Sequence, residues 1–491
     1  MNKKFFYTAA LAFALFAGAG TMKAQKIQVD PLNAEVQAMA DQILATQMED
    51  PDAANKVFTK LFRKVMKDKS QSTATAKFFL DNKVYPCAKQ LVEKAYELDA
   101  QNVNVLMIYA EVAMMRKDYG TAGQKYDEIV ALDPNNIEAL KRRAFIYKNI
   151  NPTVALEDLK KVKEVEPNNL EADKEMGDIF YKESEYAKAI EAYKPWYAGT
   201  AKNTNDFDIR SGENYVLSLF SKTDYATALK VIDEIQPLDP KDLVFHRMKF
   251  FCNYEEYNTT SMPDALKKAE EAVGYITSNE YDSLYVYLDF LYAANLFGEL
   301  EKYPEAIKYM QKGIALDSTQ ASAYKTLADL LAKNKQTDEA LEAYSKYMDM
   351  IGDGAKNIDI IRLSRMYAAA ARSAEGQKRA DYLAKGNAAL DKIEANNPGH
   401  YSVSMQRARL HNVTNEPDAT VKKFYEEALS RSEGKDEAAD SRAEAYNYLL
   451  VYAIQKDELD DARKFTNALL KIDPTAEMGL KANEYLKSKG K

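Results

Sequence analysis

The sequence has few of the residues that covalent and metal chemistry require. Its 491 residues include two cysteines, three histidines and one tryptophan. Cys87 and Cys252 lie far apart along the chain, so we expect two free, buried thiols and no disulfide. His246, His400 and His411 do not have the spacing of a metal-ligand set. We therefore expect no metal site.

Catalytic motifs are also missing. The sequence has no GxSxG, no GxxxxGK[ST] and no GxGxxG at the start of a helix. Neither cysteine has a histidine nearby in the sequence to activate it as a nucleophile. Adjacent acids such as Glu270 and Glu271 point about 100° apart on a helix, so they form a solvated face rather than an acid/base pair. We expect no catalytic residue, no cofactor and no enzyme activity.

Glycine and proline are scarce, at 18 and 14 residues, which leaves too little turn material for an all-β fold. Hydrophobic residues make up 46% and charged residues 29% of the chain, so it has enough apolar side chains to bury a core. The net charge of −8 argues against nucleic acid and anionic lipid as partners.

The first 24 residues have the layout of a secretory signal peptide. Lys3 and Lys4 precede an apolar run from Phe5 to Ala17, and small residues lead to Ala24. The run is shorter than the ~20 residues that a membrane-spanning helix needs, and no cysteine follows it for lipid attachment. We expect cleavage after Ala24, export, most simply to the periplasm, and no stable membrane insertion.

An acidic turn recurs along the chain at a regular distance. Leu132-Asp133-Pro134-Asn135-Asn136 is followed by Val165-Glu166-Pro167-Asn168-Asn169, Leu238-Asp239-Pro240 and Ile472-Asp473-Pro474, and weaker copies begin at Leu98, Leu316 and Asn396. Asp99 and Asp133 are 34 residues apart, and Asp133 and Glu166 are 33 apart. Proline sets φ for the turn, and the Asn or Asp residues cap the next helix.

Between these turns, small residues and tyrosines occupy fixed places in a pair of helices. Because closely crossing helices admit only Ala or Gly, we expect the small residues at the crossings. In the first helix of each pair they are Ala76, Ala110, Ala144, Gly177, Ala294 and Ala328. In the second helix they are Ala88, Ala122, Ala189, Ala228, Ala306, Ala340 and Ala462. Tyr126, Tyr193 and Tyr344 each lie four residues after one of the latter.

With its 34-residue period, this pattern resembles the tetratricopeptide repeat (TPR) family. The resemblance implies an all-α, right-handed superhelical solenoid of helix-turn-helix pairs with a concave groove. It divides the chain into the signal peptide (1–24), an atypical helical pair (25–68), two segments of the array (69–200 and 206–350), a degenerate array (355–475) and a capping helix (476–491). Interruptions at 197–205 and 352–354 are expected to be loops within one array.

The resemblance places candidate partner-binding residues on the groove side of the first helices. They are Met107, Glu111, Met114, Lys141, Arg142, Phe145 and Lys148. Lys141, Arg142 and Lys148 form the densest basic cluster there, which predicts an anionic, partly apolar peptide as ligand. The carboxylate clamp of the family's co-chaperone branch is absent, since only Arg142 among its five places fits.

The sequence thus predicts a non-catalytic scaffold of the cell envelope that binds a protein or peptide in the groove. The alternative is a glycan-binding protein of an outer-membrane nutrient-uptake system, with exposed aromatic residues as its platform. Trp196 and the tyrosines from Tyr275 to Tyr292 are the candidates for that platform. Packing in the core is the favoured interpretation of those tyrosines.

Overall fold

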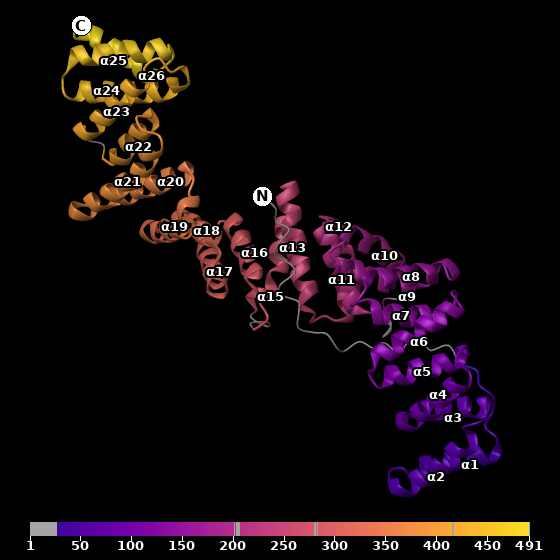
Figure 1. The fold of residues 1–491 in the computed structure, drawn as a ribbon. Helices are drawn as coiled ribbons and strands as arrows, with labels where there is room; N and C mark the ends of the chain where they lie inside the picture. The colour runs from indigo at the N-terminus through magenta and orange to yellow at the C-terminus, as the bar shows by residue number, and fades with distance from the viewer. Residues whose placement is uncertain are drawn as a thin grey trace. The chain divides into compact units, whose positions relative to one another are not determined.

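The structure is a computed structural model that describes residues 27–200, 202, 207–278, 281, 283–414 and 417–490. Helices make up 79% of the chain, and no strand occurs in the described ranges. The expected all-helical fold of consecutive helix pairs is confirmed (Figure 1). The proposed signal peptide, residues 1–24, lies outside the described residues. Among the helices described, none is long and apolar enough to cross a membrane.

The chain divides into two compact units, residues 1–248 and 249–491. Unit 1 contains α1 (Ala34–Thr46), α2 (Pro51–Val65), α3 (Lys69–Asp81), α4 (Tyr85–Leu98), α5 (Val103–Met115), α6 (Tyr119–Leu132), α7 (Ile137–Tyr147), α8 (Pro152–Val165), α9 (Leu170–Lys182), α10 (Tyr186–Gly199), α11 (Ile209–Ser221), α12 (Tyr225–Ile235) and the 3₁₀ helix η1 (Gln236–Leu238). The boundary falls inside α13 (Leu243–Thr260), at neither predicted interruption.

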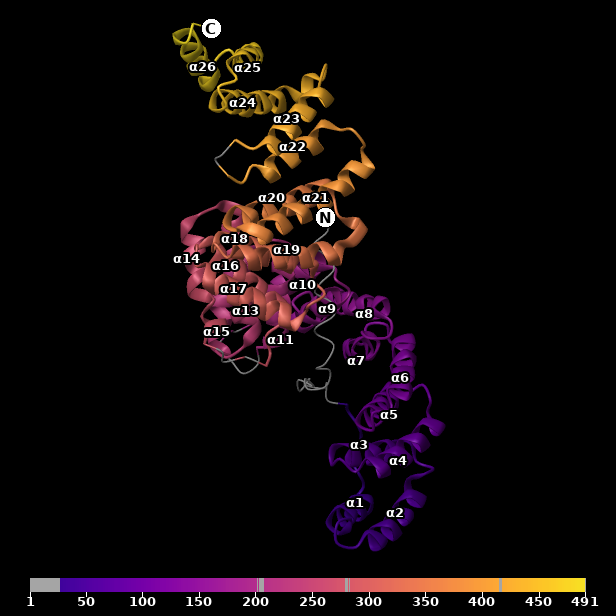
Figure 2. The same cartoon turned by 90° about the vertical axis from the view of Figure 1, so that its left-hand side faces the viewer.

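Unit 2 continues the alternation of paired helices (Figure 2). It contains α14 (Pro263–Ala272), α15 (Gly274–Thr277), α16 (Tyr287–Glu299), α17 (Tyr303–Leu316), α18 (Ala321–Lys333), α19 (Thr337–Ile351), η2 (Gly352–Gly354), α20 (Asn357–Ser373), α21 (Gly376–Asn396), α22 (Tyr401–His411), α23 (Ala419–Arg431), η3 (Asp436–Ala438), α24 (Ala439–Gln455), α25 (Leu459–Ile472) and α26 (Glu477–Ser488).

The small residues predicted at the helix crossings are buried. Ala110 on α5 and Ala122 on α6 have no exposed surface, and Ala144 on α7 is 2% exposed. Tyr126 and Tyr193 fill the space beside these crossings and are also fully buried. Each helix pair therefore closes around an alanine or glycine, with a tyrosine packed next to it in several of the pairs.

The acidic turns cap the following helices as predicted. Asn136 accepts a hydrogen bond from the Ala139 backbone N–H at 3.1 Å, and Asn169 accepts one from Ala172 at 2.9 Å. Each cap of this kind contributes about 1 kcal/mol. The turns thus fix the start of α7 and of α9, the two helices that hold most of the candidate site.

The turn inside seven of the described pairs has a feature that the sequence pattern does not predict. One residue takes a positive φ, five positions before the small residue of the second helix, and in none of the following cases is it glycine. These residues are Lys83, Lys117, Ser184, Thr223, Glu301, Lys335 and Asp457, with φ between 57° and 64°. The left-handed conformation lets the chain reverse within about three residues.

Candidate functional site

The candidate residues come from the first helices of neighbouring pairs in unit 1. Met114 on α5 and Phe145 on α7 are half-buried, as is Tyr181 on α9. We call the surface formed by Met114, Lys141, Phe145, Lys148, Lys174 and Tyr181 the first-helix face. Met107 is only 6% exposed and packs in the core around Tyr126, so it is a core residue rather than a contact residue.

The three cations of the predicted basic cluster, Lys141, Arg142 and Lys148, are all paired with carboxylates. Arg142 lies 2.8 Å from Glu138 on its own helix and 3.4 Å from Glu111 on α5. Lys141 forms an ion pair with Glu171 on α9. Carboxylates therefore offset the positive charge of the predicted basic cluster.

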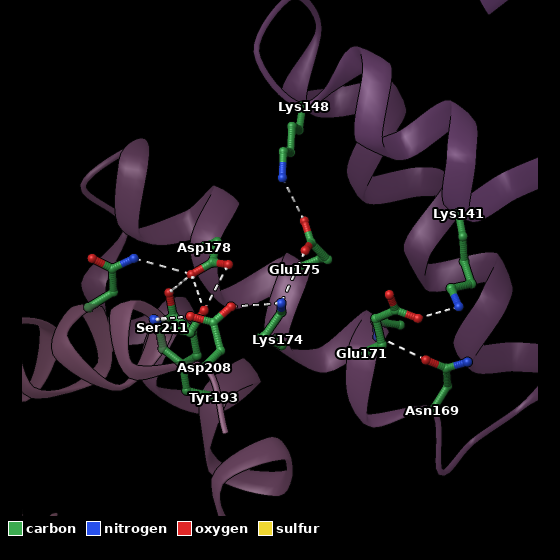
Figure 3. Close-up of polar contacts among 12 residues, drawn as sticks. Lys141, Lys148, Asn169, Glu171, Lys174, Glu175, Asp178, Tyr193, Asp208 and Ser211 are labelled. Atoms are coloured by element: carbon green, nitrogen blue, oxygen red, sulfur yellow. Dashed lines mark hydrogen bonds and ion pairs between the residues drawn. The ribbon is translucent and has the colours of Figure 1, made fainter. Parts of the chain in front are cut away.

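Further ion pairs continue from α7 to α9 and α11 (Figure 3). Lys148 lies 2.9 Å from Glu175, whose other oxygen is 3.5 Å from Lys174. Lys174 in turn lies 3.0 Å from Asp208, the N-cap of α11. Burial works against the charged form of Lys174, but Glu175 and Asp208 outweigh it and raise the pKa. Ion pairs thus connect each of the first helices α5, α7 and α9 to the next first helix.

Tyrosines of the second helices donate hydrogen bonds to carboxylates of the first helices. Tyr126 donates to Glu111 at 3.0 Å, and Tyr193 donates to Asp178 at 2.5 Å. Asp178 accepts two more hydrogen bonds from α11, where Ser211 lies at 3.1 Å and Asn214 at 3.2 Å. Burial and the nearby charge of Glu175 raise the pKa of Asp178.

The sequence interpretation identified Glu111 but missed the other acids of this network. Glu171 lies 30 residues after Lys141 and Glu175 lies 27 after Lys148, and both acids are on the first helix of the next pair. Asp178 precedes Tyr193 by 15 residues, as Glu111 precedes Tyr126. Complementary charges on successive first helices, and this acid-to-tyrosine spacing, were the available signals.

Between the two ion pairs of α7 and α9 lies a small hollow. Its lining consists of Lys141, Ala144, Phe145, Leu159, Glu171, Ala172, Glu175 and Ile179. The free volume is about 10 Å³, which suits about one water molecule. A ligand side chain does not fit without rearrangement, so contacts to a partner at this place have to be made on the surface. Lys148 lies over the Phe145 ring at 4.8 Å and shields part of it.

Three of the six aromatic residues suggested for a glycan platform are buried in the core, and Tyr281, Tyr287 and Tyr292 are half-buried. Trp196 is 4% exposed and stacks on Phe207 at 5.1 Å. Tyr275 and Tyr285 are each 6% exposed, and the Tyr275 hydroxyl donates to Asp289 at 2.8 Å. Packing in the core is therefore the role of both tyrosines.

Both cysteines have free thiols. Cys252 is buried, as predicted, whereas Cys87 is only half-buried. Burial raises the pKa of Cys87 to about 11, and it also raises the pKa of Cys252. At neutral pH both are protonated and unreactive. Across the described ranges, no three His, Cys, Asp or Glu side chains converge as a metal site would require.

Residues 291–354 match the model of the tetratricopeptide repeat family. A TPR repeat-containing protein of Methanocaldococcus jannaschii is 24% identical over 303 residues, which are 58% of this chain and 51% of the relative. The TPR repeat-containing protein YpiA of Bacillus subtilis is 23% identical over 288 residues, 52% of this chain and 65% of the relative. The Hsp70-Hsp90 organizing protein of Triticum aestivum is 27% identical over 257 residues, 50% of this chain and 41% of the relative. The chain thus spans about half the length of these relatives.

Two solved structures are also similar. The C-terminal part of a TPR repeat-containing protein from Cytophaga hutchinsonii has a TM-score of 0.40 and 17% identity, covering 55% of this chain and 98% of that one. YrrB, a TPR protein with an unusual peptide-binding site, has a TM-score of 0.34 and 17% identity, covering 38% and 95%. The segment that matches the family model, residues 291–354, forms most of α16 and all of α17 to α19.

Proposed function

We propose that this chain is a non-catalytic scaffold that binds a segment of a partner protein on the first-helix face of unit 1. The supporting observation is the cross-bracing of α5, α7, α9 and α11 by ion pairs, with Met114, Phe145 and Tyr181 half-exposed between them. A braced surface loses little conformational entropy when a partner binds, because its side chains are already held in place. Half-exposed apolar side chains supply the contact area.

The charge pattern alters the kind of partner that this proposal favours. Because Lys141, Arg142 and Lys148 are paired with acids, the face has no excess positive charge to attract an acidic peptide. A segment with apolar residues and few net charges is the better match. The naming of one relative as an organizing protein for two others is consistent with a role in assembly.

Placement in the cell envelope is part of the proposal and depends on residues 1–24. It is supported by the charged start, the apolar run and the small residues before Gln25. N-terminal sequencing of the protein from fractionated source cells is expected to begin close to Gln25, in the envelope fraction. A chain that retains Met1 in the cytoplasmic fraction would refute this placement.

Site-specific photo-cross-linking in source cells tests the binding face. A benzoyl-phenylalanine residue replaces Met114, Phe145 or Tyr181 in turn, and the controls replace Leu132 or Val165. The controls are 45% and 43% exposed but end the second helices α6 and α8. We expect one partner to cross-link at the three face positions and at neither control. Equal cross-linking at the controls would exclude this face.

A further inference from the structure

The described part of the chain begins with a short extended segment, residues 27–33, which belongs to no helix pair. It precedes α1, and Figure 1 shows this indigo segment running along the first helix pairs. Ile27 and Val29 are half-buried, whereas Gln28 and Asp30 between and after them are exposed. An alternation at every second residue is typical of an extended chain that lies on a surface with one side.

The α3 helix binds the backbone of this segment. The Gln71 side chain donates from Nε2 to the Pro31 carbonyl at 3.0 Å and accepts at Oε1 from the Asn33 N–H at 2.9 Å. The neighbouring Ser70 hydroxyl donates to the Asp30 carboxylate at 2.6 Å. A carboxamide that both donates to and accepts from one backbone recognises an extended chain rather than a particular side chain.

The apolar side chains of the segment pack against two hydrophobic clusters that share α5. Val29 and Leu32 pack against the cluster of α1 to α5, and Ile27 packs against that cluster and also against the cluster of α5 to α7. Met107 on α5 belongs to the second cluster, and Met114 of the first-helix face packs against it. The segment thus covers α5 beside residues that the sequence places on the groove side.

This attachment is looser than the packing between helices. All three apolar side chains of the segment are half-buried, whereas Val36 on the following helix is fully buried. The three hydrogen bonds to α3 are exposed, so water competes for them. Release of the segment therefore exposes little buried surface and leaves the helix pairs in place.

We propose that residues 27–33 are a displaceable strap, which occupies the surface of α3 and α5 and keeps other extended segments away from it until the strap is released. Because the strap is joined directly to α1, its high effective concentration favours the closed state. Since Ile27 and Met114 pack against one cluster, release of the strap extends the first-helix face along α5. This regulatory consequence rests on the proposed function, whereas the strap itself does not.

The test uses full-length chain labelled with ¹³C at the methionine methyl groups, with the Met107 signal identified by its loss in Met107→Leu. The probe is a capped peptide with the sequence of residues 27–33. We expect Ile27→Ser to shift the Met107 signal and the added peptide to return it saturably toward its wild-type position. The wild-type chain should bind the peptide about tenfold more weakly or less, because its own strap competes. The signal of Met48, which is 88% exposed, should stay in place.

Matched variants separate the strap from its surroundings. Gln28→Ser is the control for Ile27→Ser, since Gln28 is the exposed neighbour, and it should leave the Met107 signal in place. Gln71→Ala should weaken binding of the peptide to the Ile27→Ser chain about fivefold or more, because both backbone hydrogen bonds are lost. Its control is Gln37→Ala, whose side chain bonds within its own helix, and the affinity there should stay within about twofold. Circular dichroism checks that each variant is folded.

Three results would overturn the proposal. They are a Met107 signal that is the same in Ile27→Ser and wild type, a peptide that does not move this signal in the Ile27→Ser chain, and equal peptide affinities for the two chains. Val29→Ser repeats the comparison at a second half-buried position of the strap.

The regulatory consequence has its own measurement. We expect cross-linking of the partner at Met114 to rise about threefold in Ile27→Ser and to stay unchanged in Gln28→Ser. A rise in both variants or in neither would remove this consequence. Absence of any cross-linked partner would count against the proposed function alone, since the peptide experiment tests the strap without a partner.

Discussion

The Tyr193 hydroxyl donates a 2.5 Å hydrogen bond to Asp178, which lies 15 residues earlier on the first helix of the same pair. Tyr126 and Glu111 repeat this relationship at the same spacing. In both cases the acid is also contacted from the next first helix, by Arg142 at 3.4 Å from Glu111 and by Asn214 at 3.2 Å from Asp178. The carboxyl group thus connects successive helix pairs, because it contacts a tyrosine of its own pair and a side chain of the next first helix.

These contacts of the Asp178 carboxyl group predict a pH-dependent effect of Asp178→Asn on stability. Burial and the charge of Glu175 raise the pKa of Asp178 above its ordinary value of 3.8. The folded chain therefore keeps this proton to a higher pH than the unfolded chain does. The stability that the group contributes is complete below about pH 3.8 and is lost as the pH rises through the folded-state pKa. Asparagine does not titrate, so it removes that loss.

We expect the free energy of unfolding of Asp178→Asn, relative to wild type, to improve as the pH rises from about 4 to about 7. Urea unfolding at each pH measures the difference. Its absolute value at any one pH includes the cost of changed hydrogen bonds to Tyr193 and Ser211, so the slope is the informative quantity. A flat or opposite slope would mean that the Asp178 carboxyl is ionised as readily in the folded protein as in the unfolded chain.

The ion pairs of the first-helix face predict that charge reversal there destabilises the fold. Arg142 is 14% exposed and Glu111 is 12% exposed, so neither is well solvated. Lys141→Glu together with Arg142→Glu places new carboxylates beside Glu111, Glu138 and Glu171. We expect a loss of about 2–4 kcal/mol in the free energy of unfolding. Urea titration measures it.

An exposed ion pair provides the control for that reversal. Lys161 and Glu164 lie 2.7 Å apart on α8 with side chains 42% and 64% exposed. Reversing the charge of Lys161 alone with Lys161→Glu, which places two carboxylates side by side, should change stability by about 0.5 kcal/mol or less. Equal effects at the two places would show that the pairing across first helices adds nothing beyond a surface contact.

The sequence predicted the framework of this fold better than its surface. Ala110, Ala122 and Ala144 could be assigned to the core, because a helix crossing admits only a small side chain. Whether Arg142 is free or ion-paired could not be predicted in this way. A cation on a helix has the same local sequence pattern whether or not an acid on the preceding first helix, here Glu111, contacts it. Burial of Met107 was missed for a similar reason. Its place in the first helix was assigned to the groove, but the packing around Tyr126 encloses it.

The left-handed turn found inside seven of the described pairs could not be predicted from the sequence either, and it leads to a prediction at Thr223. This residue has φ of 63°, a conformation that is strained for a β-branched side chain and easy for glycine. We expect Thr223→Gly to raise the free energy of unfolding by about 0.5–1 kcal/mol, despite the added flexibility of the unfolded chain.

The neighbouring residue supplies the matched control for that change. Lys222 has φ of −97°, which any residue adopts. Lys222→Gly should therefore lower stability by about 0.5–1 kcal/mol. Both variants can be compared in one set of urea titrations. If both substitutions are destabilising by similar amounts, the left-handed turn at Thr223 stores no strain that glycine relieves.

Gly177 predicts a different outcome, because its missing side chain leaves room for Tyr193. A Cβ atom at this position would lie 2.5 Å from the Cδ1 and Cε1 atoms of that ring. Alanine favours a helix over glycine by about 1 kcal/mol, and Ala110 and Ala144 occupy the equivalent place in neighbouring pairs. The clash nevertheless dominates, since the ring is fully buried and can shift only at the expense of its packing and of its hydrogen bond to Asp178. We expect Gly177→Ala to lower the free energy of unfolding by about 1–3 kcal/mol.

A double-mutant cycle tests whether this clash weakens the hydrogen bond between Tyr193 and Asp178. If the added methyl group displaces the Tyr193 ring, the hydroxyl no longer reaches Asp178 at 2.5 Å. Tyr193→Phe, which removes only the hydroxyl, should therefore cost about 1–2 kcal/mol in the wild-type background. In the Gly177→Ala background it should cost much less, and the two changes should be non-additive by about 0.5 kcal/mol or more. Strict additivity would show that the ring keeps its place and that the neighbouring helix moves instead.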